Sequence, residues 1–143
     1  MLIRSVLLAT TLLVPTSCVL ADDVSAGLWE ISLEARVEAA PDFAPGPTTL
    51  TQCLAKADAR DPAKLLASVT TPESGDCSFT ERSSVGDHFR FKMQCTGTLQ
   101  MRSTGDVSVS PNRIDGVITT SSTIDGVPVE LRSTIHGRRI GDC

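Results

Sequence analysis

The cysteines are the residues of this chain whose spacing most restricts the possible chemistry. They are Cys18, Cys53, Cys77, Cys95 and Cys143. A structural zinc site needs close pairs such as C-x-x-C together with nearby histidines. These cysteines form no such close pair, and no histidine lies at a suitable spacing from them. If export removes the segment that contains Cys18, an even number of cysteines remains. The sequence then predicts two disulfides and no free thiol nucleophile.

The last four cysteines can pair in three ways. We favour Cys53–Cys77 with Cys95–Cys143, because these bridges would tie a helical insertion and the free end of the chain to a sheet. The second choice is Cys77–Cys95 with Cys53–Cys143, since Cys77 and Cys95 lie almost equally far from the turn of one expected hairpin. The remaining combination stays open.

The two histidines offer little catalytic chemistry. His88 stands next to Asp87 beside an expected turn, and His136 falls on the outer face of the expected last strand, so a surface histidine is the simpler interpretation of each. A serine hydrolase needs a nucleophile held against a base, and the chain has no Gly-x-Ser-x-Gly motif. We expect no catalytic residue, no metal and no cofactor. The alternative is a small hydrolase or modifying enzyme that uses His88 with Asp87.

Three glutamates, Glu30, Glu34 and Glu38, recur every four residues on what we expect to be a strand. They would therefore form a row on its solvated face. We expect this row to pair across strands with cations, and weak binding of a divalent cation is the alternative. The candidate partners are Arg90, Lys92, Arg102 and Arg132.

The N-terminus has the pattern of a signal peptide over residues 1–21. Arg4 precedes an apolar stretch over residues 6–14, Pro15 ends it, and Ala21 closes a small-residue cleavage site. The stretch is far shorter than the roughly 20 residues of a membrane span. An uncleaved anchor is one alternative. Lipid attachment at Cys18 is another, although a leucine-like residue is missing three positions before it.

Cleavage after Ala21 would leave one domain over residues 22–143. It removes Arg4 and no acid, which changes the formal net charge from −4 to −5. A mildly acidic domain without a basic run is a poor nucleic-acid binder, because that affinity comes largely from phosphate neutralisation. Nothing after Ala21 is apolar enough for a transmembrane segment.

Strict alternation predicts strands along most of this domain. The clearest run is 29–38, in which Trp29, Ile31 and Leu33 alternate with polar residues. Similar runs cover residues 48–54, 77–82, 89–95, 99–109, 114–120 and 127–136. Asp61 and Pro62 instead begin a helix of about two turns, as N-cap and first helical residue. Gly137 and Gly141 predict bends that bring the end of the chain back over the sheet, with Arg138 and Arg139 solvated.

These elements predict a mainly β fold, a single antiparallel meander curled into a barrel or half-barrel, with one short helix and two disulfides. Its concave face would carry apolar side chains that could hold an apolar ligand or an envelope partner. Those residues are Trp29, Ile31, Phe89, Phe91, Met93 and Leu131. Core packing is the simpler interpretation of Trp29.

Several motifs together resemble the bacterial, mostly Gram-negative, periplasmic domain-of-unknown-function family numbered 3617. They are Gly-Leu-Trp-Glu at 27–30, Cys-Leu at 53–54, Met-Gln-Cys-Thr-Gly at 93–97 and Gly-Arg-Arg-Ile-Gly-Asp-Cys at 137–143. The resemblance covers Ser25 to Cys143; Phe91 departs from it, where a tryptophan is expected. It implies a periplasmic location and a compact disulfide-bonded β domain, and it brings no activity. We therefore expect an exported binding or structural envelope protein that is not an enzyme.

Overall fold

The computed structural model describes residues 24–42, 45–70, 75–97 and 100–143. The predicted signal peptide, with its cleavage site and Cys18, lies outside the described residues. So does Leu99, which we placed in a strand. The described chain is one antiparallel sheet with a single helix, so the predicted mainly β fold is confirmed.

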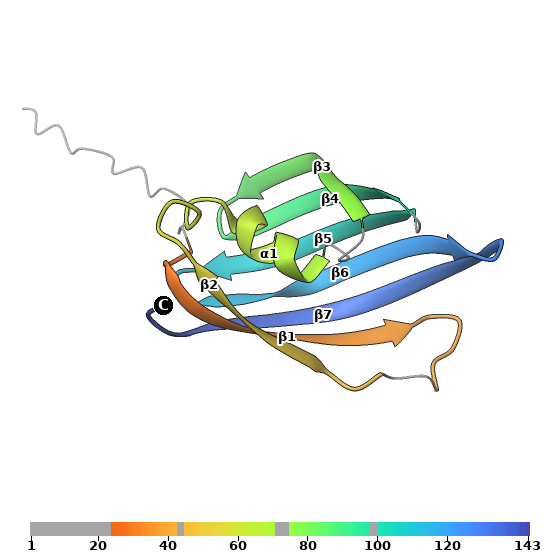
Figure 1. Ribbon diagram of the computed structural model, residues 1–143, viewed down its shortest axis with the longest axis horizontal. Coiled ribbons are helices and arrows are strands. Elements are labelled where there is room, and N and C mark those ends of the chain that lie inside the picture. The colour runs from red at the N-terminus through yellow and green to blue at the C-terminus, as the bar shows by residue number, and fades with distance from the viewer. Residues whose placement is uncertain (1–23, 43–44, 71–74, 98–99) are drawn as a thin grey trace, which may run out of the picture.

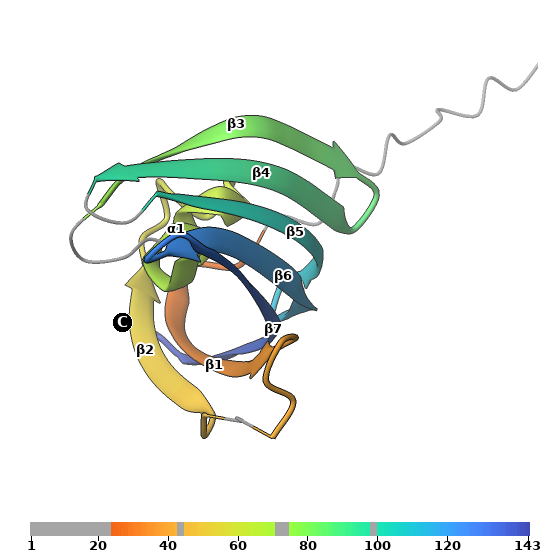
Figure 2. The same cartoon turned by 90° about the vertical axis from the view of Figure 1, so that its right-hand side faces the viewer.

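The sheet has seven strands in the order β2-β1-β7-β6-β5-β4-β3. The elements are β1 (Gly27–Val37), β2 (Thr48–Leu54), α1 (Pro62–Thr70), β3 (Gly75–Val85), β4 (His88–Gly97), β5 (Met101–Ser110), β6 (Arg113–Ile124) and β7 (Val127–Gly141). Strands β3 to β7 form a meander, and β1 joins its far side by pairing with β7. β2 and β3 are therefore the two edges, and the sheet curls into a half-barrel without closing (Figure 1, Figure 2).

The helix α1 lies inside the curve of the sheet (Figure 2). It begins as the sequence predicts: the backbone N–H of Ala63 donates to Asp61 Oδ1 at 3.1 Å, and Pro62 occupies the first helical position. Leu65 and Leu66 are fully buried against the sheet. In the part of the chain that the structure describes, no helix has the length and apolarity to cross a membrane.

The disulfides are Cys53–Cys143 and Cys77–Cys95, so the pairing that we favoured is wrong and the second choice is confirmed. Strand order explains the result. Cys53 lies on edge strand β2 and Cys77 on the opposite edge strand β3, which separates them by the width of the sheet. Cys77 and Cys95 are direct cross-strand partners with Cα atoms 4.0 Å apart. Leu28 of β1 pairs with both Cys53 and Gly141, so the end of β7 arrives close to Cys53.

The expected bend at Gly137 is also wrong, because β7 continues through it to Gly141. Gly137 is buried and stands in register with Ile31 on β1 and Ile114 on β6. A Cβ atom placed there would lie 3.3 Å from the Cβ atom of Ile114 and 3.8 Å from the Trp29 ring. The glycine therefore makes room for the core within a continuous strand.

The two arginines near the chain end are not simply solvated. Arg138 forms an ion pair with Glu30 at 2.7 Å. Arg139 has a side chain only 26% exposed, and its Nε atom donates to the carbonyl oxygen of Ala26 at 2.8 Å. Both contacts cross from β7 to the start of the described chain and reinforce the β1–β7 pairing.

An aromatic ring fills the space above a glycine in the middle of the sheet. Phe91 on β4 is in register with Gly105 on β5, and a Cβ atom at Gly105 would lie 2.2 Å from the Phe91 ring. Phe79 meets the same ring edge to face, with centroids 5.5 Å apart, and Phe89 stacks on it at 5.8 Å. Gly105 thus leaves room for the Phe91 ring against β5.

Gly105→Ala should lower the free energy of unfolding by about 1–3 kcal/mol, the usual cost of overpacking a core. Urea unfolding with the disulfides intact measures this. Gly46→Ala is the matched control, because a Cβ atom there meets nothing within 4 Å. Equal stability of the two variants would show that Phe91 is not held against Gly105.

Replacing Cys53 and Cys143 together by alanine should lower the free energy of unfolding by up to about 4.5 kcal/mol, because their bridge spans a sequence separation of 90. Far-ultraviolet circular dichroism should be unchanged, since the strand pairing does not require the bridge. Peptide mapping without reduction checks the connectivity, and a peptide linking Cys53 to Cys77 would contradict it.

Candidate functional site

Most of the apolar side chains predicted for a concave binding face lie inside the core. Trp29, Ile31, Phe89, Phe91 and Met93 are only 0–4% exposed. They belong to one cluster with Leu65 and Leu66 of α1. Leu131 is separate from this cluster and half-buried, opposite Val37 and Thr120. Five of the six residues therefore pack within the core of the described chain.

His88 lies on the outer face of the sheet within a polar cluster. Its Nδ1 atom is 3.1 Å from Asp106 Oδ1, and its Nε2 atom is 3.9 Å from Asp87 Oδ1. Ser108 is the register partner of His88, but its hydroxyl donates to Asp87 Oδ2 at 2.9 Å. A serine whose proton is held by a carboxylate is not paired with the imidazole as a hydrolase requires.

A second polar cluster, also built on a His–Asp pair, surrounds His136. Its Nδ1 atom is 2.7 Å from Asp115 Oδ1, and Arg113 donates two hydrogen bonds to the same carboxylate. The hydrogen bonds from Arg113, followed by that from His136, hold the pKa of Asp115 below its usual value. The pKa of Asp106 is lowered likewise, first by the hydrogen bond with His88 and then by Arg90.

The glutamate row of β1 has other partners than we expected. Glu30 pairs with Arg138, and Glu34 pairs with Arg36 at 3.5 Å. The prediction that the row would pair with cations on other strands was therefore wrong in its partners. Strand order explains the absence of pairs with Arg90, Lys92 and Arg102, because β1 borders β2 and β7 and does not border β4 or β5. Arg132 lies on β7 but stands in register with Arg36.

Two of those cations on β4 have acidic partners of their own. Arg90 Nε is 2.9 Å from Asp106 Oδ2, and Lys92 Nζ is 2.9 Å from Glu81 Oε2. They line a pocket of about 690 Å³ on the outer face of β3, β4 and β5, which we call the central pocket. It is lined by Thr80, Glu81, Arg82, Ser83, Arg90, Phe91, Lys92, Thr104 and Gly105.

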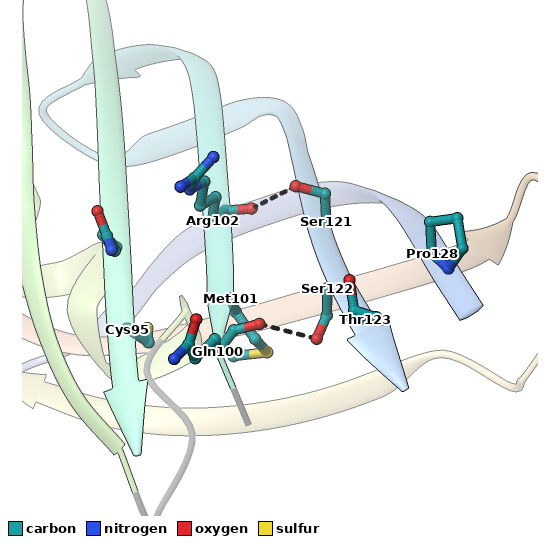
Figure 3. Close-up of a pocket in the computed structure, with 9 residues that line it drawn as sticks. Cys95, Gln100, Met101, Arg102, Ser121, Ser122, Thr123 and Pro128 are labelled. Carbon is teal, nitrogen blue, oxygen red and sulfur yellow. Dashed lines mark hydrogen bonds between the residues drawn. The ribbon is translucent and has the colours of Figure 1, made fainter. Parts of the chain in front are cut away.

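A second pocket, of about 510 Å³, lies where β4 and β6 end and where β5 and β7 begin (Figure 3). We call it the end pocket. It is lined by Gln94, Cys95, Gln100, Met101, Arg102, Ser121, Ser122, Thr123 and Pro128. Most of these side chains are exposed ones of the outer face, and none of them is acidic.

Backbone acceptors already engage two hydroxyls of the end pocket. Ser122 donates to the carbonyl oxygen of Gln100 at 2.9 Å, and Ser121 donates to that of Arg102 at 3.5 Å (Figure 3). The two pockets are neighbours, because Lys92–Thr104 and Gln94–Arg102 are successive register pairs on the same face. Together they give the outer face a polar hollow that is rich in hydroxyl groups.

Sequence reasoning did not single out the end pocket. Arg102 was considered only as an ion-pair partner for the glutamates. The outward-facing serines and threonines near the end of β6 were the one available signal, and hydroxyls on an exposed strand are too common to indicate a site. Their meeting with Arg102 depends on the register of β5 with β6.

Comparison with known proteins identifies the family to which the chain is similar. A family model described as "Protein of unknown function (DUF3617)" matches residues 24–143, which confirms the resemblance found in the sequence motifs. No curated protein and no solved structure matches the chain.

Asp115→Asn should destabilise the protein slightly at pH 7, and the deficit should shrink as the pH falls below about 4. The pKa of Asp115 is lowered in the folded state, so its ionised form stabilises the fold above the ordinary carboxyl pKa. That contribution is lost as the pH falls through the lowered value. Urea midpoints between pH 7 and pH 3 measure it, with Asp125→Asn on the exposed hairpin turn as control. A deficit independent of pH would contradict the assignment.

Proposed function

The chain belongs to this family of proteins of unknown function, and we propose that it is an exported, non-catalytic binding protein of the bacterial envelope. The half-barrel is a rigid scaffold, and the ligand binds in the end pocket on its outer face. The observation that carries the proposal is the end pocket itself, a polar hollow of about 510 Å³ that contains an arginine and no acid.

The covalent structure supports export. All four cysteines of the described residues are joined in disulfides, which form and persist in oxidising compartments and are rare in the cytosol. Residues 1–21 supply the matching address: a basic start, a short apolar segment and a small-residue cleavage site at Ala21. Periplasmic location after cleavage, leaving a domain over residues 22–143, is part of the proposal.

The geometry of the polar side chains supports binding over catalysis. The arrangement closest to a catalytic one is His88 with Asp106, and the nearby Ser108 is engaged by Asp87 instead. These side chains lie on the open outer face, where water competes with every interaction. Binding through several polar contacts is the chemistry that this face can supply.

The disulfide between β3 and β4 supports a preformed site. Cys95 lines the end pocket, and its bond to Cys77 ties β4 to the edge strand β3 at this position. A wall fixed by a covalent bond loses little conformational entropy when a ligand binds. The wall of the pocket that β4 supplies is thus pre-organised.

The experiment is native mass spectrometry of the full chain produced with its own leader and purified from the periplasm. The expected species begins at Asp22, contains two disulfides and carries additional mass from a bound ligand. Thr123→Trp, which fills the end pocket, should reduce ligand occupancy at least tenfold.

Thr49→Trp is the matched control, because Thr49 is an exposed threonine on β2, outside both pockets. It should retain the occupancy of the parent protein. A correctly processed protein that never carries a ligand, or equal occupancy in both variants, would count against the proposed binding function.

A further inference from the structure

Arg102 differs from most other arginines of the described chain in having no acidic partner. Six of the nine form ion pairs with carboxylates: Arg36, Arg82, Arg90, Arg113, Arg138 and Arg139. Arg60, Arg102 and Arg132 form none within the described residues. Of these three, Arg102 alone lines the end pocket or the central pocket.

The surroundings of Arg102 leave its charge uncompensated. Its register partners are Gln94 on β4 and Ser121 on β6, both neutral. The next residue in that row is Glu130, which pairs with Ser121 and so lies two strands away from Arg102. The central pocket differs, because its three cations, Arg82, Arg90 and Lys92, all have acidic partners. These are Asp61, Asp106 and Glu81 in the same order. An anion therefore gains more in the end pocket than in the central one.

The end pocket also supplies neutral donors around the guanidinium. Gln94 and Gln100 carry side-chain amide groups, and Thr123 carries a hydroxyl; no hydrogen bond within the described structure engages these groups. Ser121 and Ser122 already donate to carbonyl oxygens, so they remain acceptors. A guanidinium fork with several added N–H and O–H groups matches an oxyanion that has more than two charged or acceptor oxygens.

We propose that the end pocket binds the phosphate group of a small polar molecule, with Arg102 as its principal ligand. This inference rests on the proposed function and names the ligand class of the same pocket. A phosphate offers three acceptor oxygens and up to two negative charges near neutral pH, whereas a carboxylate offers two oxygens and one charge. The pocket volume of about 510 Å³ leaves room for the polar remainder of the molecule beside Met101 and Pro128.

The test is an NMR titration of the mature, disulfide-bonded protein with glycerol 3-phosphate, and with acetate as the comparison anion. Glycerol 3-phosphate should shift the amide resonances of residues 100–102 and 121–123 and should bind at least tenfold more tightly than acetate. Binding should weaken as salt is added, because an exposed cation is screened.

Arg102→Gln should weaken the binding of glycerol 3-phosphate at least tenfold. Arg102→Lys should weaken it less, because lysine keeps the charge and loses the planar fork. Arg132→Gln is the matched control: Arg132 is an exposed arginine of β7, forms no carboxylate pair in the described structure and lines neither pocket. It should change affinity less than twofold. Urea midpoints confirm that each variant is folded, and if Arg102→Gln is not, Thr123→Val replaces it.

Sedimentation with vesicles identifies the source of the phosphate. Arg102-dependent binding to vesicles that contain phosphatidic acid, absent with phosphatidylcholine alone, would assign it to a lipid headgroup. Binding of glycerol 3-phosphate alone would assign it to a soluble compound. Equal affinity for acetate, or affinity unchanged in Arg102→Gln, overturns the inference. An uncharged ligand that is found by mass spectrometry and retained by Arg102→Gln overturns the phosphate and leaves the binding function standing.

Discussion

The pairing of β1 with β7 is the contact on which the rest of the structure depends. It joins strands from the two ends of the described chain, from Leu28 with Gly141 to Val37 with Leu131. Bringing such distant segments together costs loop-closure entropy that the local hairpins do not. Burial of Trp29, Ile31 and Ile135 offsets that cost. The Arg138–Glu30 ion pair also favours the pairing, at the surface. Once β1 lies beside β7, β2 becomes an edge and Cys143 can reach the edge strand β2.

Packed side chains cover much of the inner face of the half-barrel. The leucines of α1 cover the sheet, and the aromatic cluster around Phe91 lies directly against Gly105. Because interiors are close-packed, these apolar side chains stabilise the fold and are not available to a ligand without rearrangement. Binding on the outer face is consistent with this arrangement, since the polar side chains of β4, β5 and β6 are already exposed there.

Charge on that outer face is mostly arranged in pairs. The two His–Asp–Arg clusters, around Asp106 and Asp115, place each carboxylate between an imidazole and a guanidinium. Exposed pairs of this kind contribute little stability individually. They do neutralise the surface locally, and this makes an arginine without an acidic partner chemically distinct. Arg102 has that property and also lines a pocket, so electrostatics and shape indicate the same place.

Local properties were predictable because they depend on neighbours in sequence. Alternation of apolar and polar residues predicted the strands, and Asp61 and Pro62 predicted the start of α1. The family motifs and the even number of cysteines also follow from the sequence alone. Each of these inferences needs only a local conformational preference or a count.

What the sequence could not supply was the order of the strands. Alternation tells which side of a strand is buried, but it does not tell which strand lies beside it. That choice decided that Cys53 bonds to Cys143, that Glu30 meets Arg138, and that Arg102 lies among Gln94, Ser121 and Thr123 without an acid. The sequence by itself therefore determined the elements and their buried faces. Only the tertiary structure decided the disulfide partners and the candidate site, because both depend on long-range pairing of strands.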